Sequence, residues 1–234
     1  MILLILSLDT TAVTATACLC DGEKRLGEYT VTTTLHHSET MLPMIEHLLS
    51  SCGKHTDDIE LFAAAAGPGS FTGVRIGAAV LLGLAFGRNV PCVGVSSLES
   101  LSYNMKGFMG DFIVCPVMDA RRNQLYNAVF RHTDGKITRL CEDRVIMSDE
   151  LAHELEAYDI PVYFVGDGKH IIKNDFEKGL FPPEQIALQS AYSSAQVARI
   201  IYENTDDKTV FSDKTFKPTY LRSSQAERNL KKID

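Results

Sequence analysis

The order of the predicted strands and helices constrains the fold of this chain more than any other feature of its sequence. Apolar runs and alternating segments predict three strands at the start, and Asp21-Gly22 predicts a hairpin turn between the second and the third. Apolar residues at helical spacing then predict a helix that begins near residue 41, because Pro43 disfavours an earlier start, and ends at Gly53. The first half is expected to hold strands at 2–8, 12–20, 27–34, 61–66 and 90–95, and helices at 41–52, 71–86 and 97–105.

The second half begins with the same order of elements. Strands are predicted at 112–118, 124–131, 137–145 and 162–165, and helices at 148–155 and from Ser193 to about residue 204. In both halves the first strand ends in an aspartate, Asp9 or Asp119. The repeat indicates either a duplication or a chance similarity, since hairpins and αβ units are common. We interpret it as a duplication that gives two lobes of an α/β protein, each with a mixed sheet in the order βββαβα. The expected parts are an N-terminal lobe at 1–106, a C-terminal lobe at 107–213 and a basic tail at 214–234.

The charge of the chain argues against a protein that binds nucleic acid tightly on its own. Asp and Glu number 30 against 23 Lys and Arg, so a net charge of -7 repels a phosphate backbone on average. No stretch reaches the roughly 18 apolar residues of a membrane span. The apolar start of the chain also lacks the basic residues of a secretion signal. We therefore expect a cytoplasmic protein without a membrane association.

Two polar turns and one glycine-rich loop are candidates for binding. Carboxylate and hydroxyl groups after the first strand could hold a hydrated metal or a phosphate, but they are also typical of a hairpin turn. The segment Gly67-Pro68-Gly69-Ser70-Phe71-Thr72-Gly73 leads from a strand into a helix, where an anion is favoured, or it is a tight turn with packing glycines. It lacks the lysine and the spacing of a Walker A loop. The candidate nucleotide or phosphate contacts are Asp9, Thr10, Thr11, Gly67, Gly69 and Ser70.

Asp119-Ala120-Arg121-Arg122 offers a similar choice in the second half, between contact with a phosphate or acidic group and an exposed turn. Neither half contains a catalytic pattern. The seven histidines have no pair at i, i+3 or i+4, and Gly-x-Ser-x-Gly is absent. We therefore predict no catalytic residue and no metal ligand. Residues 214–234 hold six basic and two acidic residues, as in a frayed end or in part of a larger RNA-binding surface.

Two predicted helices carry more apolar surface than one lobe can cover. The helix at 71–86 is apolar nearly all round, and the helix at 41–52 has an apolar stripe. Glycine in a helix costs about 1 kcal/mol relative to alanine, so Gly73 and Gly77 indicate the close approach of another element. We expect this burial to be shared with a partner chain, through Met41, Leu42, Ile45, Leu48, Leu49, Gly73, Gly77 and Val80.

Several of these segments together resemble the bacterial TsaB (YeaZ) family. They are Asp9-Thr10-Thr11, residues 37–43, the specific string from Gly67 to Gly77, Asp119-Ala120-Arg121, and Pro218-Thr219-Tyr220-Leu221-Arg222. The matches extend over nearly the whole chain and are weakest in the second half before residue 214. The resemblance implies an actin-like (ASKHA) fold of two ribonuclease-H-like lobes, which agrees with the repeat.

The resemblance also implies a function. TsaB-like proteins act in forming N6-threonylcarbamoyladenosine on the adenosine beside the anticodon of tRNAs that read ANN codons. The transferase of that pathway is the paralogue TsaD, and TsaE is its ATPase. A TsaB-like chain would be a non-catalytic scaffold that works with TsaD-like and TsaE-like partners, forms a homodimer when alone and meets tRNA only through the complex. It would have no cofactor of its own, with ATP or ADP as a candidate ligand at the interface of the complex.

Two other functions stay open at this point. A stand-alone actin-like kinase or ATPase would bind ATP and Mg²⁺ tightly by itself. A metal-dependent peptidase, which the older label "glycoprotease" for this group suggests, would bind zinc or iron in stoichiometric amounts.

Overall fold

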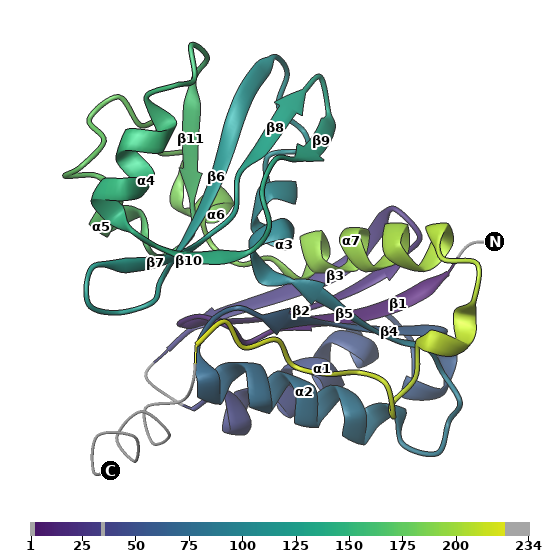
Figure 1. The fold of residues 1–234 in the computed structure, drawn as a ribbon. Coiled ribbons are helices and arrows are strands. Elements are labelled where there is room, and N and C mark those ends of the chain that lie inside the picture. The colour runs from purple at the N-terminus through teal and green to yellow at the C-terminus, as the bar shows by residue number, and fades with distance from the viewer. Residues whose placement is uncertain (1–2, 34–35, 223–234) are drawn as a thin grey trace, which may run out of the picture.

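The described part of the chain, residues 3–33 and 36–222 of a computed structural model, forms two lobes that are each built on a mixed β-sheet (Figure 1). The strand order of the first sheet is β3-β2-β1-β4-β5. The first three strands are antiparallel, whereas β4 runs parallel to β1 and to β5. These strands are β1 (Leu4–Asp9), β2 (Thr14–Asp21), β3 (Lys24–Thr32), β4 (Leu61–Gly67) and β5 (Cys92–Ser96).

Helices cover both faces of the first sheet. α1 (His37–Ser51) and α2 (Phe71–Ala85) cover one face, where Leu8, Leu48 and Leu81 are buried (Figure 1). α3 (Ser97–Tyr103) and α7 (Ala191–Asn204) cover the other face. Every side chain of β1 is buried between these layers, as the continuous apolar run predicts. A short 3₁₀ turn, η1 (Thr56–Asp58), precedes β4.

The second lobe repeats the centre of this arrangement. β6 (Asp111–Asp119) has antiparallel neighbours on one side and the parallel strand β11 (Val162–Val165) on the other, just as β1 lies between β2 and β4. α4 and α5 pack on the outer face of this sheet, and α3 packs on the face toward the first lobe. The remaining elements are β7 (Gln124–Asn127), β8 (Phe130–Thr133), β9 (Lys136–Arg139), β10 (Arg144–Met147), α4 (Ser148–Leu155), α5 (Lys169–Ile172) and α6 (Glu184–Ala187).

Two strands that the sequence predicts as continuous are divided in the structure. The segment 124–131 forms β7 and β8, and the segment 137–145 is divided between β9 and β10. Asn127 lies buried at the first break, where its Nδ2 donates to the carbonyl oxygens of Pro116 and Ala128 at 3.0 and 2.9 Å. A side chain thus replaces ladder hydrogen bonds at this point, which a hydropathy pattern cannot reveal.

α1 begins four residues earlier than predicted. It starts at His37 and contains Pro43, although proline cannot donate a hydrogen bond inside a helix. Met41 and Met44 lie on either side of Pro43 and are buried against the sheet. Their packing offsets the missing hydrogen bond, so the helix continues through the proline.

The chain returns to the first lobe after the second. α7, expected as the last helix of the C-terminal lobe, packs against β1, β2 and β4 instead. After a 3₁₀ turn, η2 (Lys208–Val210), Phe216 enters the core of the first lobe, and the backbone N of Thr219 donates to Ala66 O at 2.7 Å. Residues 191–219 therefore pack with the first lobe, and the start of the expected tail is anchored there. An amphipathic helix does not specify which sheet it covers. Residues 223–234 lie outside the described residues.

Candidate ligand cleft between the lobes

Asp9 and Asp119 end the central strands of the two lobes and form the same kind of turn. Oδ1 of Asp9 accepts hydrogen bonds from the backbone N and from Oγ1 of Thr11, at 2.8 and 2.7 Å. Oδ1 of Asp119 accepts one from the backbone N of Arg121 at 2.6 Å. Each carboxylate thus binds the residue two positions further on, as in an Asx turn. The two strand ends correspond in local structure as well as in sequence.

A glycine loop also follows the parallel strand of each lobe. Gly67 at the end of β4 and Gly166 just after β11 have φ values of 113° and 108°, which residues with a Cβ rarely adopt. The first loop continues through Gly69 into α2, and the second, Gly166-Asp167-Gly168, continues into α5. The sequence analysis identified only the first loop. The second was recognisable from its two glycines at the same spacing after a short apolar strand.

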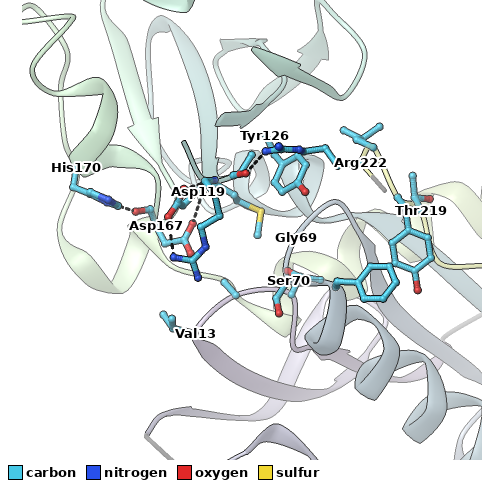
Figure 2. A pocket seen from close by; sticks show the side chains of 17 residues that line it. Val13, Gly69, Ser70, Asp119, Tyr126, Asp167, His170, Thr219 and Arg222 are labelled. Carbon is cyan, nitrogen blue, oxygen red and sulfur yellow. Dashed lines mark hydrogen bonds and ion pairs between the residues drawn. The ribbon is translucent and has the colours of Figure 1, made fainter. Parts of the chain in front are cut away.

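These turns and loops face one another across an open cleft of about 500 Å³ (Figure 2). Ser70 and Val13 of the first lobe lie opposite Asp119 and Asp167 of the second, and the segment from Thr219 to Arg222 closes one side. Several residues outside the six candidate contacts also line the cleft. Phe71, Thr219 and Tyr220 belong to segments named from the sequence, whereas no sequence signal indicated Tyr126, Asp167 and His170.

Three of the six candidate phosphate contacts line the cleft, and these are Thr11, Gly69 and Ser70. Asp9 and Thr10 lie behind the wall of the cleft and are each 1% exposed. Burial raises the pKa of Asp9 to about 6. Gly67 is buried too, and it lies so close to the carbonyl group of Thr219 that a Cβ at this position would clash with it. Thr11 is 0% exposed as well, so a ligand in the cleft would meet the exposed Ser70 rather than Asp9 or the side chain of Thr11.

The glycines of the loop and of α2 allow close packing against the turn after β1. A Cβ at Gly73 would clash with the carbonyl oxygen of Thr10, and a Cβ at Gly77 would lie 2.6 Å from Thr10 Oγ1. Thr10 Oγ1 in turn donates to Gly73 O at 2.7 Å, and the backbone N of Ser70 donates to Thr11 O at 2.7 Å. The tight-turn interpretation accounts for the spacing of the glycines. Phosphate contact at Ser70 stays a prediction.

The cleft brings carboxylate and guanidinium groups together. Burial raises the pKa of Asp167, and the nearby charge of Asp119 raises it further. Arg121 is 85% exposed and lies 3.6 Å from Asp119 Oδ2, and Arg222 donates to the carbonyl oxygen of Ala120 (Figure 2). An anion in the cleft would find these arginines and the N-terminus of α2, where the helix dipole favours negative charge.

Within residues 3–33 and 36–222, no group of three or more His, Cys, Asp or Glu side chains is arranged to hold a metal ion. The helices of this part of the chain include none with the length and apolar character needed to cross a bilayer.

Comparison with known proteins identifies the family. The sequence model of a family described as "TsaD: tRNA N6-adenosine threonylcarbamoyltransferase" matches residues 31–230. A Bacillus subtilis protein named "tRNA threonylcarbamoyladenosine biosynthesis protein TsaB" is 32% identical over 173 residues, which is 74% of this chain and 75% of that protein. The Haemophilus influenzae protein of the same name is 30% identical over 236 residues and covers 97% of both chains. The chain belongs to the TsaB (YeaZ) family.

Solved structures agree on the fold of this TsaB family member. A solved structure described as "YeaZ from Pseudomonas aeruginosa" superposes with a TM-score of 0.79 at 22% identity, covering 94% of this chain and 100% of that one. A second structure from the same organism, described as similar to peptidase YEAZ, gives 0.81 at 23% identity with the same coverage. The predicted fold class, an α/β protein of two lobes that each contain a mixed sheet, is confirmed.

The structure also locates the eight residues that the sequence analysis assigned to a partner surface. Six of them are buried inside this chain, which corrects the assignment of their side chains to an outer surface: Met41, Ile45, Leu48, Leu49, Gly73 and Gly77. The glycine face of α2 meets the Thr10 turn rather than a second chain. Leu42 is 45% exposed and Val80 is half-buried. These two remain available to a partner.

An apolar strip remains on the outer side of α2. It consists of the half-buried Ile76 and Val80, the exposed Ala79 and Gly83, and Phe86, which is 79% exposed. A Cβ at Gly83 would meet no atom within 4 Å. Contiguous exposed apolar surface is typical of a site where another protein binds.

Proposed function

We propose that this chain is a non-catalytic partner subunit in the formation of N6-threonylcarbamoyladenosine, on the adenosine beside the anticodon of tRNAs that read ANN codons. It would act with a TsaD-like transferase and a TsaE-like ATPase. The observation that carries the proposal is full-length similarity to proteins named for this biosynthesis, including the Haemophilus influenzae relative with 97% coverage. A contribution to tRNA binding would come only through the assembled complex.

The apolar strip on α2, residues 76–86, supports the role of a partner subunit. The helix α2 lies beside α1, whose Leu42 is also exposed, and both helices cover the side of the first sheet that faces away from the second lobe (Figure 1). We propose that this face binds the TsaD-like transferase in the complex and a second copy of the chain when the transferase is absent. Burying such a strip removes apolar surface from water, which is the main driving force of stable association.

The interlobe cleft is the place where this chain would contact ATP or ADP at the junction of the complex. Ser70 at the N-terminus of α2 and the guanidinium groups of Arg121 and Arg222 fit a phosphate. Asp119 and Asp167 would repel it, so the cleft alone is a weak anion site. We therefore propose a contact that the partner completes, with no cofactor held by the isolated chain.

The proposal is tested by co-purifying the chain with the TsaD-like protein of the same organism. Modification of tRNA is then measured with the transferase and the ATPase, in the presence and absence of this chain. We expect a stable complex, modification that depends on the chain, and no transfer or ATP hydrolysis by the chain alone. Tight ATP–Mg²⁺ binding with turnover by the isolated chain would instead indicate a kinase or ATPase. Stoichiometric zinc or iron together with peptidase activity would instead indicate a metal-dependent peptidase.

A further inference from the structure

The exposed faces of α1 and α2 carry opposite charges. α1 contains the acidic residues Glu39 and Glu46 and no lysine or arginine, whereas α2 contains Arg75 and no acidic residue. All three of these side chains are exposed. Glu39, Leu42 and Glu46 follow one another at helical spacing along α1, and Arg75 lies one turn before Ala79 of the apolar strip. Each helix thus presents one line of exposed residues, with negative charge on α1 and positive charge on α2.

Two aromatic rings hold the guanidinium group of Arg75 in place. Its central carbon lies 3.9 Å from the ring centre of Phe71 and 5.9 Å from that of Tyr220. Its Nε donates a hydrogen bond to the hydroxyl group of Tyr220 at 3.3 Å, and the centres of the two rings are 4.8 Å apart. A guanidinium group that is already fixed loses little conformational entropy on binding, so Arg75 is prepared for a carboxylate.

These charges are not neutralised inside the described part of the chain. Within residues 3–33 and 36–222, neither Arg75 nor the two glutamates of α1 form an ion pair. Arg88, which follows α2, is by contrast paired with Asp57 at 2.7 Å. α1 and α2 are neighbours, yet their opposite charges stay apart. A second copy that places its α1 against this α2 would bring them together.

The strand order fixes the direction of the two helices. β2 is antiparallel to β1 and to β3, and β4 is parallel to β1 and to β5, so β3, β4 and β5 all run the same way. α1 connects β3 to β4, and α2 connects β4 to β5. The two helices therefore also run in one direction and begin at the same edge of the sheet (Figure 1).

This shared direction limits how two copies can meet face to face. A two-fold axis along the helices places α1 of each copy against α2 of the other, with their N-terminal ends together. A two-fold axis across the helices places α1 against α1, so the two lines of carboxylates face each other and repel. The charges therefore favour the first arrangement.

We propose that two copies of the chain associate with α1 of each against α2 of the other, and that Arg75 of one copy binds the partner's Glu39. Both residues lie in the first two turns of their helices, whereas Glu46 lies about two turns further along α1. Leu42 and the apolar strip are buried between the two symmetric ion pairs. The inference rests on the proposed self-association of the free chain, and it adds the residues that set the orientation of the dimer.

The test measures self-association of the full chain by sedimentation equilibrium. Arg75→Glu and Glu39→Arg should each weaken the dimer by about tenfold or more, because each change places like charges together at two symmetric positions. The double variant with both changes should return to within about threefold of the wild type, because the charges are exchanged but still opposite. Glu46→Arg is the matched control, and its combination with Arg75→Glu should not restore the dimer. Circular dichroism checks the fold of each variant.

A salt series tests the ion pair by a second route. The wild-type dimer should weaken as the NaCl concentration rises, and the dimer of Arg75→Gln should depend less on salt. Equal salt dependence of the two would overturn the proposal. So would a chain that stays monomeric at its highest soluble concentration, wild-type affinity in a folded Arg75→Glu variant, or rescue by Glu46→Arg and not by Glu39→Arg. The tRNA modification assay uses the complex with the TsaD-like protein, so the proposed function succeeds or fails independently of these measurements.

Discussion

Thr11 holds the carboxylate of Asp9 through only one of its two oxygens. Oδ1 accepts both hydrogen bonds, whereas Oδ2 is buried and has no partner in the described part of the chain. Burial disfavours the charged form more than these two bonds favour it, so the pKa of Asp9 rises from 3.8 to about 6. At neutral pH the first lobe therefore contains an ionised carboxylate in a place that favours a neutral group.

Asp9→Asn should stabilise the protein at neutral pH. A carboxyl pKa that is higher in the folded state contributes stability at low pH, and this contribution is lost as the pH rises from 3.8 to about 6. The loss is about 3 kcal/mol at most. Asn keeps an acceptor for Thr11 and carries no charge, so it should match the wild type near about pH 4 and exceed it near about pH 7.5. Urea denaturation at both pH values measures the difference.

The control for this experiment is Asp159→Asn, an exposed aspartate of the second lobe. It should leave the pH dependence of the free energy of unfolding as it is in the wild type. If Asp9→Asn were less stable than the wild type at neutral pH, the ionised carboxylate would have a partner or a role that the geometry does not indicate.

Gly77 and Gly83 lie on different sides of α2, and alanine should have opposite effects at the two positions. A Cβ at Gly77 would lie 2.6 Å from Thr10 Oγ1 and 3.2 Å from Leu8 Cδ1. We expect Gly77→Ala to destabilise the monomer by about 1–3 kcal/mol through overpacking. Gly83 faces open space, so Gly83→Ala should stabilise it by about 0.5–1 kcal/mol through helix propensity. Equal effects in thermal denaturation would contradict the assignment of the two faces.

This contrast shows what the sequence could and could not predict. The apolar pattern of α2, together with Gly73 and Gly77, correctly indicated that another part of a protein approaches this helix closely. The pattern could not indicate that the approaching group is the Thr10 turn of the same chain rather than a partner. Close approach requires glycine whether the approaching group belongs to the same chain or to a partner, so only the three-dimensional structure distinguishes the two cases.

Local signals predicted most of the first lobe, because its five strands and the helices α1, α2 and α3 come from one continuous segment of the chain. The second lobe was harder for two reasons. Asn127 replaces ladder hydrogen bonds at a break that has no hydropathy signature, and α7 crosses back to the first sheet over a long sequence distance. For the cleft, Thr11, Gly69 and Ser70 were predictable from motifs. Tyr220 and its neighbours belong to a segment that the family resemblance included, but nothing in its sequence indicated that it lies at this cleft.

Charges placed on the outer strip of α2 should disrupt association without unfolding the monomer. Ala79 and Leu42 are exposed, so Ala79→Glu and Leu42→Glu keep the core intact but bury a charge in the proposed interface. We expect at least about a tenfold loss of affinity for the TsaD-like partner. Leu48 is 1% exposed, so Leu48→Asp should unfold the lobe instead.

Light scattering and calorimetry measure the association, and circular dichroism checks the fold of each variant. Ala157→Glu, at an exposed position of the second lobe, is the matched control and should bind like the wild type. If Ala79→Glu and Leu42→Glu both fold and bind with the affinity of the wild type, the interface lies elsewhere on the molecule.

The isolated chain should bind tRNA only weakly and with a modest dependence on salt. The net charge is -7, and several arginines are neutralised by carboxylates, among them Arg131 by Asp111 at 2.6 Å and Arg144 by Glu154 at 2.8 Å. The exposed Arg121 and Arg122 and the basic residues of the C-terminal segment are the main cations left for phosphates. Because each phosphate contact contributes about one to the slope of log K against log salt concentration, we expect a slope of only a few in magnitude.

Fluorescence anisotropy with labelled tRNA at several salt concentrations measures this slope. Deletion of residues 223–234 should remove most of the binding, and replacing both Arg121 and Arg122 with alanine should reduce what remains. Sub-micromolar affinity at physiological salt that survives both changes would show that the chain recognises tRNA by itself, without the complex.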